Sequence, residues 1–394
     1  MSSDFDVLRV NRFVLKKQRL TGENLNESIV DTVRAVGGLH ATGATTPYLS
    51  LFARRKGFRR EDLDRDLYVK RSLCKVRFVR TTVYVLPRDR IAAAFAATKM
   101  LVQPTSEAYM KFLGVTEQQY RETSRSIIEL LKGKNGMPVK KIREALGTSL
   151  NVSPIVNLMC DQGLLVRGAP EKGWRSNLHT YRLLSDCFPD VKLDEISEED
   201  AKEAVVRWYL GSFGPVTEND AAWWTGFRKS EVRRILGKLE SEIVSVDVSG
   251  CDKSLLMLSK DEAELKRVRN DGEPVVSLLP GLDPFLMGYK DRDRFLDAER
   301  YSFVFDRGGN ATSSILVDGK VVGVWDFEEP VVKIFLFDDG KAGLLKEISD
   351  KAKSLGAFIC GHDVELKVCG SMTPLNLRTA GGVMSPLRDC CAIA

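Results

Sequence analysis

The order of expected elements between residues 120 and 184 limits what this chain can fold into more than any other feature. Apolar residues recur at helical spacing in three segments, at residues 120–131, 139–146 and 153–163. Two segments rich in strand formers follow, at 164–167 and 179–184, and a basic loop with glycines separates them. Three helices followed by a two-stranded hairpin are the order of a winged helix-turn-helix module, which binds duplex DNA.

The same order returns after a charged linker at residues 194–200. Helices are expected at 201–210, 218–224 and 229–239, and hairpin strands at 243–248 and 255–258. The first part of the chain has helices followed by strand formers at 73–86, so it is predicted to be a related module. Repetition of a DNA-reading unit indicates that the chain binds duplex DNA.

Strand formers dominate the chain after residue 274. Strands are expected at 275–279, 301–305, 313–317, 320–327, 331–337 and 364–369, and one helix at 341–355. The dipeptide Asp318-Gly319 is typical of a two-residue hairpin turn. The pattern predicts a β-rich domain with one helix, in a form such as a small barrel.

The predicted fold class is therefore α+β, with about three tandem winged helix-turn-helix modules followed by a C-terminal β-rich, barrel-like domain. The expected boundaries place an N-terminal winged-helix-like module with the active-site loop at residues 1–118 and a second winged helix at 119–193. A third winged helix is expected at 194–272, and the β-rich domain at 273–394.

The distribution of basic residues says more about partners than the modest net charge of +5. They gather in three clusters, namely Arg54, Arg55, Lys56, Arg59 and Arg60, then Lys70, Arg71, Lys75, Arg77 and Arg80, and then Arg228, Lys229, Arg233 and Arg234. Each cluster alone would fit a solvated helix or strand face. Three clusters, two in the first module and one in the third, favour contacts with the phosphates of DNA.

The remaining composition predicts a monomeric cytoplasmic protein without a metal or an organic cofactor. The eight cysteines form no C-x-x-C pair, and Cys360, His362 and Cys369 are too few ligands for a zinc site. No stretch of about 18 apolar residues predicts a membrane helix, and the first residues do not resemble a secretory signal. Residues 391–394 match the short prenylation pattern, which we interpret as a chance match.

Six motifs in a fixed order carry a resemblance to a known family. They are Gly-Leu-His-Ala-Thr at 38–42, Leu-Phe-Ala-Arg at 51–54, and the stretches at 79–87, 213–217, 279–292 and 317–325. On these motifs the chain resembles, over residues 5–355, the winged-helix DNA-binding proteins that include the AlkZ-like DNA glycosylases. The resemblance implies a monofunctional glycosylase that acts on bulky or crosslinked N7-alkylated purines in double-stranded DNA.

The family keeps a catalytic Gln-x-Gln or Gln-x-Asp pair in the loop where this chain has His40-Ala41-Thr42. The resemblance therefore implies that His40 and Thr42 are the catalytic residues. An N7-alkylated purine is cationic, so a catalyst must hold water against C1′ and stabilise the positive charge that develops on the sugar. A neutral histidine can orient that water and accept its proton, whereas a protonated histidine would repel the cation.

Two alternatives stay open for the residues of this site. His40 could cap the end of a helix expected at 28–39, with Thr42 starting a turn. Asp283 and Asp291 are candidates for a catalytic carboxylate, but turn formation and ion pairing with Arg292 or Arg294 explain them better.

The expected DNA contacts come from basic residues and from one aromatic wing residue. They are Arg54, Arg55, Arg80, Lys172, Trp174, Arg175, Arg228 and Lys229. Arg54 and Arg80 would contact phosphates or brace the loop, and Trp174 would enter the base stack or pack within the wing. Two other functions remain open, a non-catalytic DNA-binding regulator or damage sensor and a small-molecule sensor that uses the β-rich domain.

Overall fold

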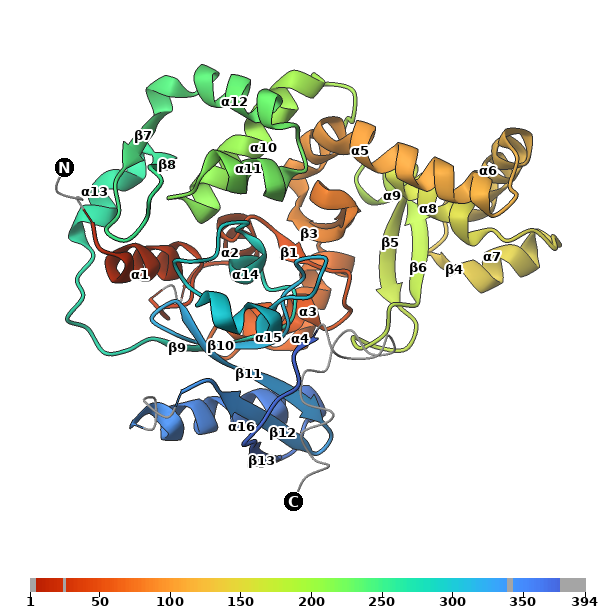
Figure 1. Ribbon diagram of the computed structural model, residues 1–394. Coiled ribbons are helices and arrows are strands. Elements are labelled where there is room, and N and C mark those ends of the chain that lie inside the picture. Colours follow the sequence, from red (N-terminus) through yellow and green to blue (C-terminus); the bar gives the residue numbers. More distant parts are fainter. Residues whose placement is uncertain (1–4, 24–25, 339–342, 376–394) are drawn as a thin grey trace.

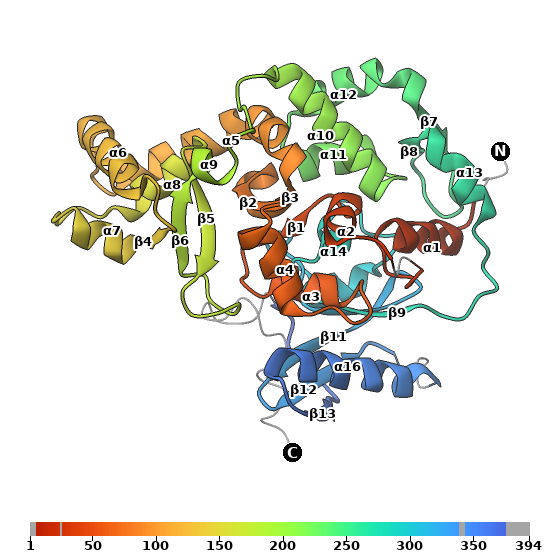
Figure 2. The ribbon, with the colours of Figure 1, turned by 180° about the vertical axis from the view of Figure 1, so that it is seen from behind.

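Three helix-rich units and one open sheet make up the protein, in an α+β arrangement (Figure 1). The computed structural model describes residues 5–23, 26–338 and 343–375. The second unit lies to one side, the third lies above the first, and the C-terminal sheet with its long helix lies below. The view from behind in Figure 2 shows the same order. The residues 391–394 that match the prenylation pattern lie outside the described part of the chain.

The first unit places a short three-stranded sheet among helices. Its elements are α1 (Val7–Lys17), α2 (Ile29–Ala35), β1 (Leu39–His40), α3 (Thr46–Phe52), α4 (Arg60–Asp64), η1 (Arg65–Val69), β2 (Leu73–Arg77), η2 (Val79–Thr81), β3 (Val83–Pro87) and η3 (Arg88–Arg90). The sheet has the order β1-β3-β2 and is antiparallel. Asp6 and Ser28 cap α1 and α2 by accepting hydrogen bonds from backbone N–H groups of the first turn.

The second unit follows the long helix α5 (Ile91–Phe112). It contains α6 (Glu117–Leu131), β4 (Met137–Pro138), α7 (Val139–Ala145), α8 (Ser153–Asp161), β5 (Leu165–Pro170), β6 (His179–Leu183) and α9 (Leu184–Cys187). The strands form a sheet in the order β4-β6-β5. The expected three helices and hairpin strands are confirmed. Buried residues such as Ile127, Ile142 and Leu165 give this unit a hydrophobic core of its own.

The third unit repeats this order of elements without the additional short strand. It contains α10 (Glu198–Phe213), α11 (Glu218–Thr225), α12 (Lys229–Lys238), η4 (Glu240–Glu242), β7 (Ile243–Val246), β8 (Leu255–Leu258) and α13 (Ser259–Arg267). Thr217 caps α11, and Gly226 ends it in the left-handed conformation. The expected helices and hairpin strands are confirmed here too.

An open five-stranded sheet, rather than a barrel, forms the C-terminal part. Its elements are β9 (Val276–Leu279), α14 (Pro284–Met287), η5 (Ala298–Arg300), α15 (Tyr301–Val304), β10 (Ser314–Val317), β11 (Lys320–Glu328), β12 (Val331–Leu336), α16 (Leu345–Cys360) and β13 (Glu365–Val368). The order is β13-β12-β11-β10-β9, so β9 and β13 are edge strands. Only β13 runs parallel to its neighbour. The barrel-like expectation is wrong, because α16 covers one face and the sheet does not close on itself.

One local expectation is also wrong. Residues 301–305 were expected as a strand, but Tyr301–Val304 form the short helix α15. A backbone hydrogen bond closes this single helical turn, and aromatic rings stack along it. The helix α5 contains Pro104 and continues through it. Pro104 lies on the exposed side of the helix, where a lost backbone hydrogen bond is replaced by water.

The hydrophobic core joins segments that are far apart in the sequence. One cluster of buried residues contains Phe13 from the first unit, Trp224 from the third and Phe285 from the C-terminal part. A second cluster packs α16 against the sheet through residues such as Ile348 and Ile334. The second unit and part of the first unit have buried clusters of their own, and the shared cluster joins the rest of the first unit to the third unit and to the C-terminal part.

A buried ion pair fixes the first unit to the C-terminal part. Arg54 donates two parallel hydrogen bonds to the carboxylate of Asp283, at 2.7 and 2.8 Å, and both side chains are 0% exposed. Ser50 also donates to Asp283, and Arg54 donates to the backbone oxygens of Gln18 and Ser50. The carboxylate in turn accepts from the N–H of Phe285 at the start of α14. The guanidinium and the carboxylate are thus fully hydrogen-bonded in the interior.

We predict that Arg54→Met destabilises the protein by about 3–5 kcal/mol, because it leaves the buried Asp283 carboxylate without its counter-charge. Urea unfolding of the two proteins measures this difference. Arg233→Met is the control, because it breaks the exposed pair with Glu218 and should cost at most about 1 kcal/mol. Equal small losses in both variants would contradict the structural role of the Arg54–Asp283 pair.

Candidate functional site

Two glycines bring the loop that contains His40 into contact with the core. Gly37 and Gly38 follow α2 and have φ angles of 76° and 99°. A Cβ atom on Gly38 would lie 2.7 Å from Cδ2 of Leu86, and one on Gly37 would lie 2.8 Å from Cε2 of Phe213. Only glycine combines these backbone angles with this close approach. The chain therefore turns sharply from α2 into β1 and places His40 at a defined point.

His40 lies within the first unit's sheet and not at a helix end. It pairs with Tyr84 of β3, and the centroids of the two rings are 4.5 Å apart. The side chain is buried, and its Nδ1 has no hydrogen-bond partner among the described residues. Since α2 ends at Ala35, the alternative in which His40 caps this helix is wrong.

The surroundings of His40 keep its imidazole neutral. Burial, and to a smaller extent the positive charge of Arg80, lower the pKa of His40 to about 3. Tyr84 separates the imidazole from a larger aromatic cluster, in which its ring meets those of Phe78 and Trp224 edge to face. At physiological pH the residue is thus an uncharged hydrogen-bonding group in an apolar setting.

Thr42 lies at the exposed end of the same loop. It follows His40 by two residues, in the bend that precedes α3. Its backbone oxygen accepts a hydrogen bond from Nδ2 of Asn177, in the hairpin loop of the second unit, at 3.3 Å. At the far end of the loop, Oγ1 of Thr46 donates to the backbone oxygen of Gly281. The loop is therefore held by the second unit on one side and by the C-terminal part on the other.

Arg80 joins this site to the third unit. It adopts a left-handed conformation with φ of 52°, and its guanidinium lies 3.9 Å from the ring centroid of Trp223. Burial lowers the pKa of Arg80, and Tyr84 and Asp306 oppose this shift. The bend of η2 and the Trp223 ring hold the guanidinium near His40, which suits the expected bracing role.

A second arginine continues this wall. The guanidinium of Arg292 lies 3.4 Å from the ring centroid of Phe305 and 5.3 Å from that of Trp223. It donates to the backbone oxygen of Gly309, and burial lowers its pKa to about 10. Arg80, Trp223 and Arg292 thus form a stacked cationic and aromatic wall beside the loop.

The carboxylate on this side of the molecule is Asp306, which sequence reasoning missed. Its charge acts on both Arg80 and Arg292, and it accepts hydrogen bonds from the backbone and side chain of Asn310. The available signal was the run Asp-Arg-Gly-Gly-Asn at 306–310, whose composition is typical of a tight turn. Nothing in the sequence placed this turn near residue 80.

The two carboxylates that sequence reasoning selected have structural roles instead. Asp283 is paired with Arg54 in the interior. Asp291 pairs with Lys253 and accepts hydrogen bonds from Thr217 and Asn219. Ion pairing is therefore confirmed for both residues, but the partners are Arg54 and Lys253 and not the expected Arg292 or Arg294.

Arg54 does not reach DNA. The expected phosphate contact is wrong, because the guanidinium is fully buried and saturated by Asp283, Ser50 and Gln18. The bracing role considered beside it is confirmed. Arg55 points elsewhere and donates to Oγ1 of Thr32 at 2.9 Å.

Trp174 packs within the protein instead of projecting from the wing. Its ring centroid lies 5.3 Å from that of Tyr48 and 6.0 Å from that of Phe358, and the Arg60 guanidinium lies 5.1 Å above it. Arg175 donates to the backbone oxygen of Ile359 and to Glu329. The expected insertion of Trp174 into DNA is therefore wrong for this conformation, and its packing alternative is confirmed.

Four of the expected DNA contacts are exposed, and of these Arg175 is paired with Glu329. Lys172 lies in the loop between β5 and β6, and Arg228 and Lys229 lie at the start of α12. A Cβ atom on Gly226, two residues before Arg228, would lie 3.6 Å from the backbone nitrogen of Arg80. The segment that leads into α12 is thus close to Arg80. The neighbouring Arg233 and Arg234 pair with Glu218 and Glu199.

The described residues offer few sites for other chemistry. They contain no group of three or more histidine, cysteine, aspartate or glutamate side chains arranged to hold a metal ion. Among the same residues, no helix has both the length and the apolar character that are needed to cross a membrane.

Known proteins match this chain over most of its length. A family model described as "DNA glycosylase AlkZ-like" matches residues 33–358. An interstrand DNA cross-link repair glycosylase of Streptomyces sahachiroi is 23% identical over 342 residues, which are 82% of this chain and 89% of that protein. The solved structure of the Streptomyces sahachiroi DNA glycosylase AlkZ aligns with a TM-score of 0.74 and 21% identity. That alignment covers 92% of this chain and 99% of the solved one.

We predict that lowering the pH from 7 to 5 destabilises the protein partly through His40. Its folded pKa lies below the unfolded value of 6.5, so the unfolded chain binds the proton first and stability falls as pH drops from 6.5 towards 3. The contribution at pH 5 is about 2 kcal/mol. Urea unfolding at pH 7 and at pH 5 should show that His40→Gln loses less unfolding free energy than the wild type, by about this amount. An unchanged slope would mean that His40 is not held neutral.

Proposed function

This chain belongs to the AlkZ-like family of DNA glycosylases, and on that premise we propose that it hydrolyses the N-glycosidic bond of bulky or crosslinked N7-alkylated purines in duplex DNA. The observation that carries the proposal is the neutral, buried imidazole of His40 at the position of the family's catalytic pair. The named activity of the Streptomyces sahachiroi relative supports the crosslink as substrate class.

The chemistry of the substrate suits a weakly basic catalyst. The alkylated purine is already cationic, so it leaves with the electron pair of the glycosidic bond and becomes neutral. Water then forms the new bond to C1′ and releases a proton. Water at the strongly electrophilic C1′ becomes acidic, so a histidine with a pKa of about 3 suffices to orient it and to accept that proton. Orientation supplies most of the expected rate.

Three neighbours would assist His40. The exposed hydroxyl of Thr42 would hold the water in line with the bond that breaks. Asp306 would counter the positive charge that develops on the sugar and that of the two arginines. Arg80 would bind the phosphate that flanks the lesion, which offsets the repulsion between its guanidinium and the sugar cation.

We infer that the three helix-rich units act as winged-helix modules, with boundaries near residues 118, 193 and 272. The order of three helices and a hairpin in the second and third units supports this interpretation. Lys172, Arg228 and Lys229 would supply phosphate contacts, since they are exposed on the second and third units. The separate core of the second unit would let it adjust its position on DNA. The protein would act as a monomer.

One observation favours a second function, a non-catalytic damage sensor. His40 is only 2% exposed, so a substrate reaches it only if the loop adjusts. A sensor would bind alkylated duplex DNA with strong salt dependence and release no base.

We predict that the purified protein releases base from duplex DNA containing N7-alkylguanine, and that His40→Ala slows this release by about 100-fold or more. DNA affinity should be unchanged, because the side chain contacts the sugar and water and not the phosphates. Mild heat or base after incubation cleaves the abasic product and measures the rate. His362→Ala is the control, since this exposed histidine follows α16, away from the loop. A wild-type protein that binds this DNA and leaves it intact would point to the sensor.

We predict that the single-turnover rate of base release is nearly independent of pH between 5.5 and 8. His40 stays neutral throughout this range because its pKa is about 3. A stopped assay with excess protein measures the rate at each pH. A rate that falls below pH 6.5 as a single group gains a proton would contradict this account of His40.

A further inference from the structure

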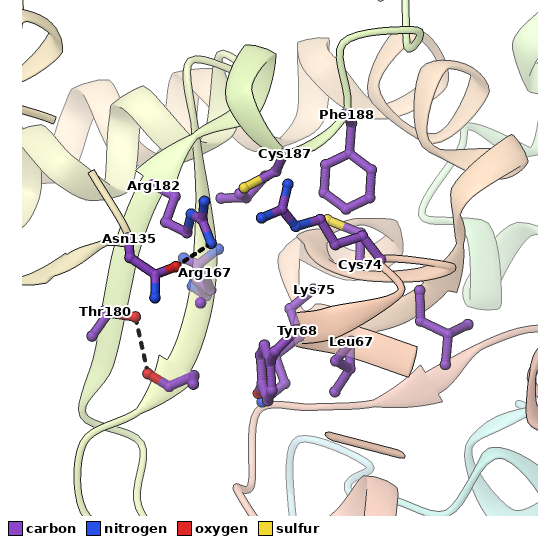
Figure 3. Close-up of a pocket in the computed structure, with 15 residues that line it drawn as sticks. Leu67, Tyr68, Cys74, Lys75, Asn135, Arg167, Thr180, Arg182, Cys187 and Phe188 are labelled. Atoms are coloured by element: carbon purple, nitrogen blue, oxygen red, sulfur yellow. Dashed lines mark hydrogen bonds between the residues drawn. The ribbon is translucent and has the colours of Figure 1, made fainter. Parts of the chain in front are cut away.

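A cavity of about 150 Å³ lies between the first and second units, away from the His40 loop (Figure 3). Lys75 and Tyr68 approach it from the first unit. Arg167, Arg182 and Asn135 approach it from the second unit. Neither catalysis nor the expected DNA contacts of the wing use these side chains.

Positive charge dominates the walls of this cavity. Four cationic side chains line it, namely Arg71, Lys75, Arg167 and Arg182, and no carboxylate is among the described residues that line it. None of the four forms an ion pair with a carboxylate in the described part of the chain. Four cations at one cavity repel one another unless an anion binds among them.

Lys75 is the most unusual of the four. It lies in the middle of β2 and is only 4% exposed. Its ammonium lies 5.7 Å from the ring centroid of Tyr68 and has no hydrogen-bond partner within the described residues. A buried ammonium with three donors to satisfy costs free energy unless an acceptor is supplied.

The arginines opposite are also incompletely satisfied. Arg182 donates to Oδ1 of Asn135 at 2.7 Å, but its buried Nε has no partner among the described residues. Arg167 has only a long contact of 3.4 Å to Asn157. Both strands of the second unit's hairpin therefore present unused N–H donors on this side.

Two carboxylates whose charges act on the cations of this cavity have other partners. Asp64 accepts a hydrogen bond from the hydroxyl of Tyr48 at 2.6 Å. Asp161 pairs with Arg77 at 2.7 Å and is hydrogen-bonded by Ser106. Neither carboxylate lines the cavity, and each offsets only part of the charge there, Asp64 that of Lys75 and Asp161 that of Arg167.

The pKa shifts of Lys75 and His179 agree with an excess of positive charge in this region. Burial lowers the pKa of Lys75 to about 8, with Asp64 opposing the shift and Arg167 adding to it. Burial, Lys75 and Arg167 together lower the pKa of His179 to about 3. A bound anion would offset these effects.

We propose that this cavity is a binding site for a phosphate group, carried either by the DNA backbone or by a small free phosphate. A phosphate carries up to two charges and has several acceptor oxygens, which match two arginine forks and one ammonium. The volume admits one such group and not a nucleoside with it. The site is independent of the proposed glycosylase activity, because it shares no residue with the His40 loop.

The test measures thermal unfolding and calorimetric binding of the full-length protein with inorganic phosphate or pyrophosphate. Chloride at equal ionic strength is the reference. We expect phosphate to raise the melting temperature beyond chloride, and Lys75→Met to weaken phosphate binding by about tenfold. Without phosphate, Lys75→Met should melt at the same temperature or higher, because it removes an unpaired buried charge. Arg182→Gln is a second variant, in case Lys75→Met does not fold.

Lys140→Met is the matched control, since this lysine is exposed on α7. Competition with unmodified duplex DNA separates the two sources. Displacement of phosphate by DNA, with weaker DNA binding by Lys75→Met, would assign the DNA backbone. Phosphate binding that persists with DNA bound would assign a free phosphate. Equal effects of phosphate and chloride, or equal phosphate affinity in the wild type, Lys75→Met and Arg182→Gln, would overturn the proposal.

Discussion

The buried pair of Arg54 and Asp283 is the interaction on which the rest of the structure depends. It joins residues 229 positions apart in the sequence, with both side chains fully removed from solvent. Arg54 ends the segment that follows the His40 loop, and Asp283 begins α14 in the C-terminal part. Because a buried charge without its partner is strongly unfavourable, this contact fixes the register between the two parts. The loop is held at its far end for the same reason.

The other end of the loop is fixed by shape instead of charge. Gly37 and Gly38 let β1 lie against β3 and α10 where any side chain would clash. The same close packing buries His40 and, with Arg80 nearby, keeps it uncharged. The histidine therefore resembles in its electrostatics the neutral amide that the family has at this position. In the proposed mechanism, His40 would orient water as an uncharged side chain, as a glutamine would.

Local sequence patterns were enough to predict most helices and strands, whereas long-range contacts set the surroundings of the site residues. Helical spacing correctly predicted helices such as α6, α8 and α12, and Asp318-Gly319 correctly predicted the turn between β10 and β11. The strand predicted at residues 301–305 was wrong, because a short apolar run fits a strand or a helical turn equally well.

The site residues were harder for a physical reason. Arg54 looked like a surface cation because its partner is 229 residues away, and Asp306 was missed because no pattern connects it to Arg80. The position of His40 came from the resemblance, and its neutrality came only from the structure.

The most direct test compares base release from N7-alkylguanine DNA by the wild type, His40→Gln and His40→Ala. The account predicts that His40→Gln stays within about tenfold of the wild-type rate, because both side chains orient water without charge. A His40→Gln variant as slow as His40→Ala would contradict it.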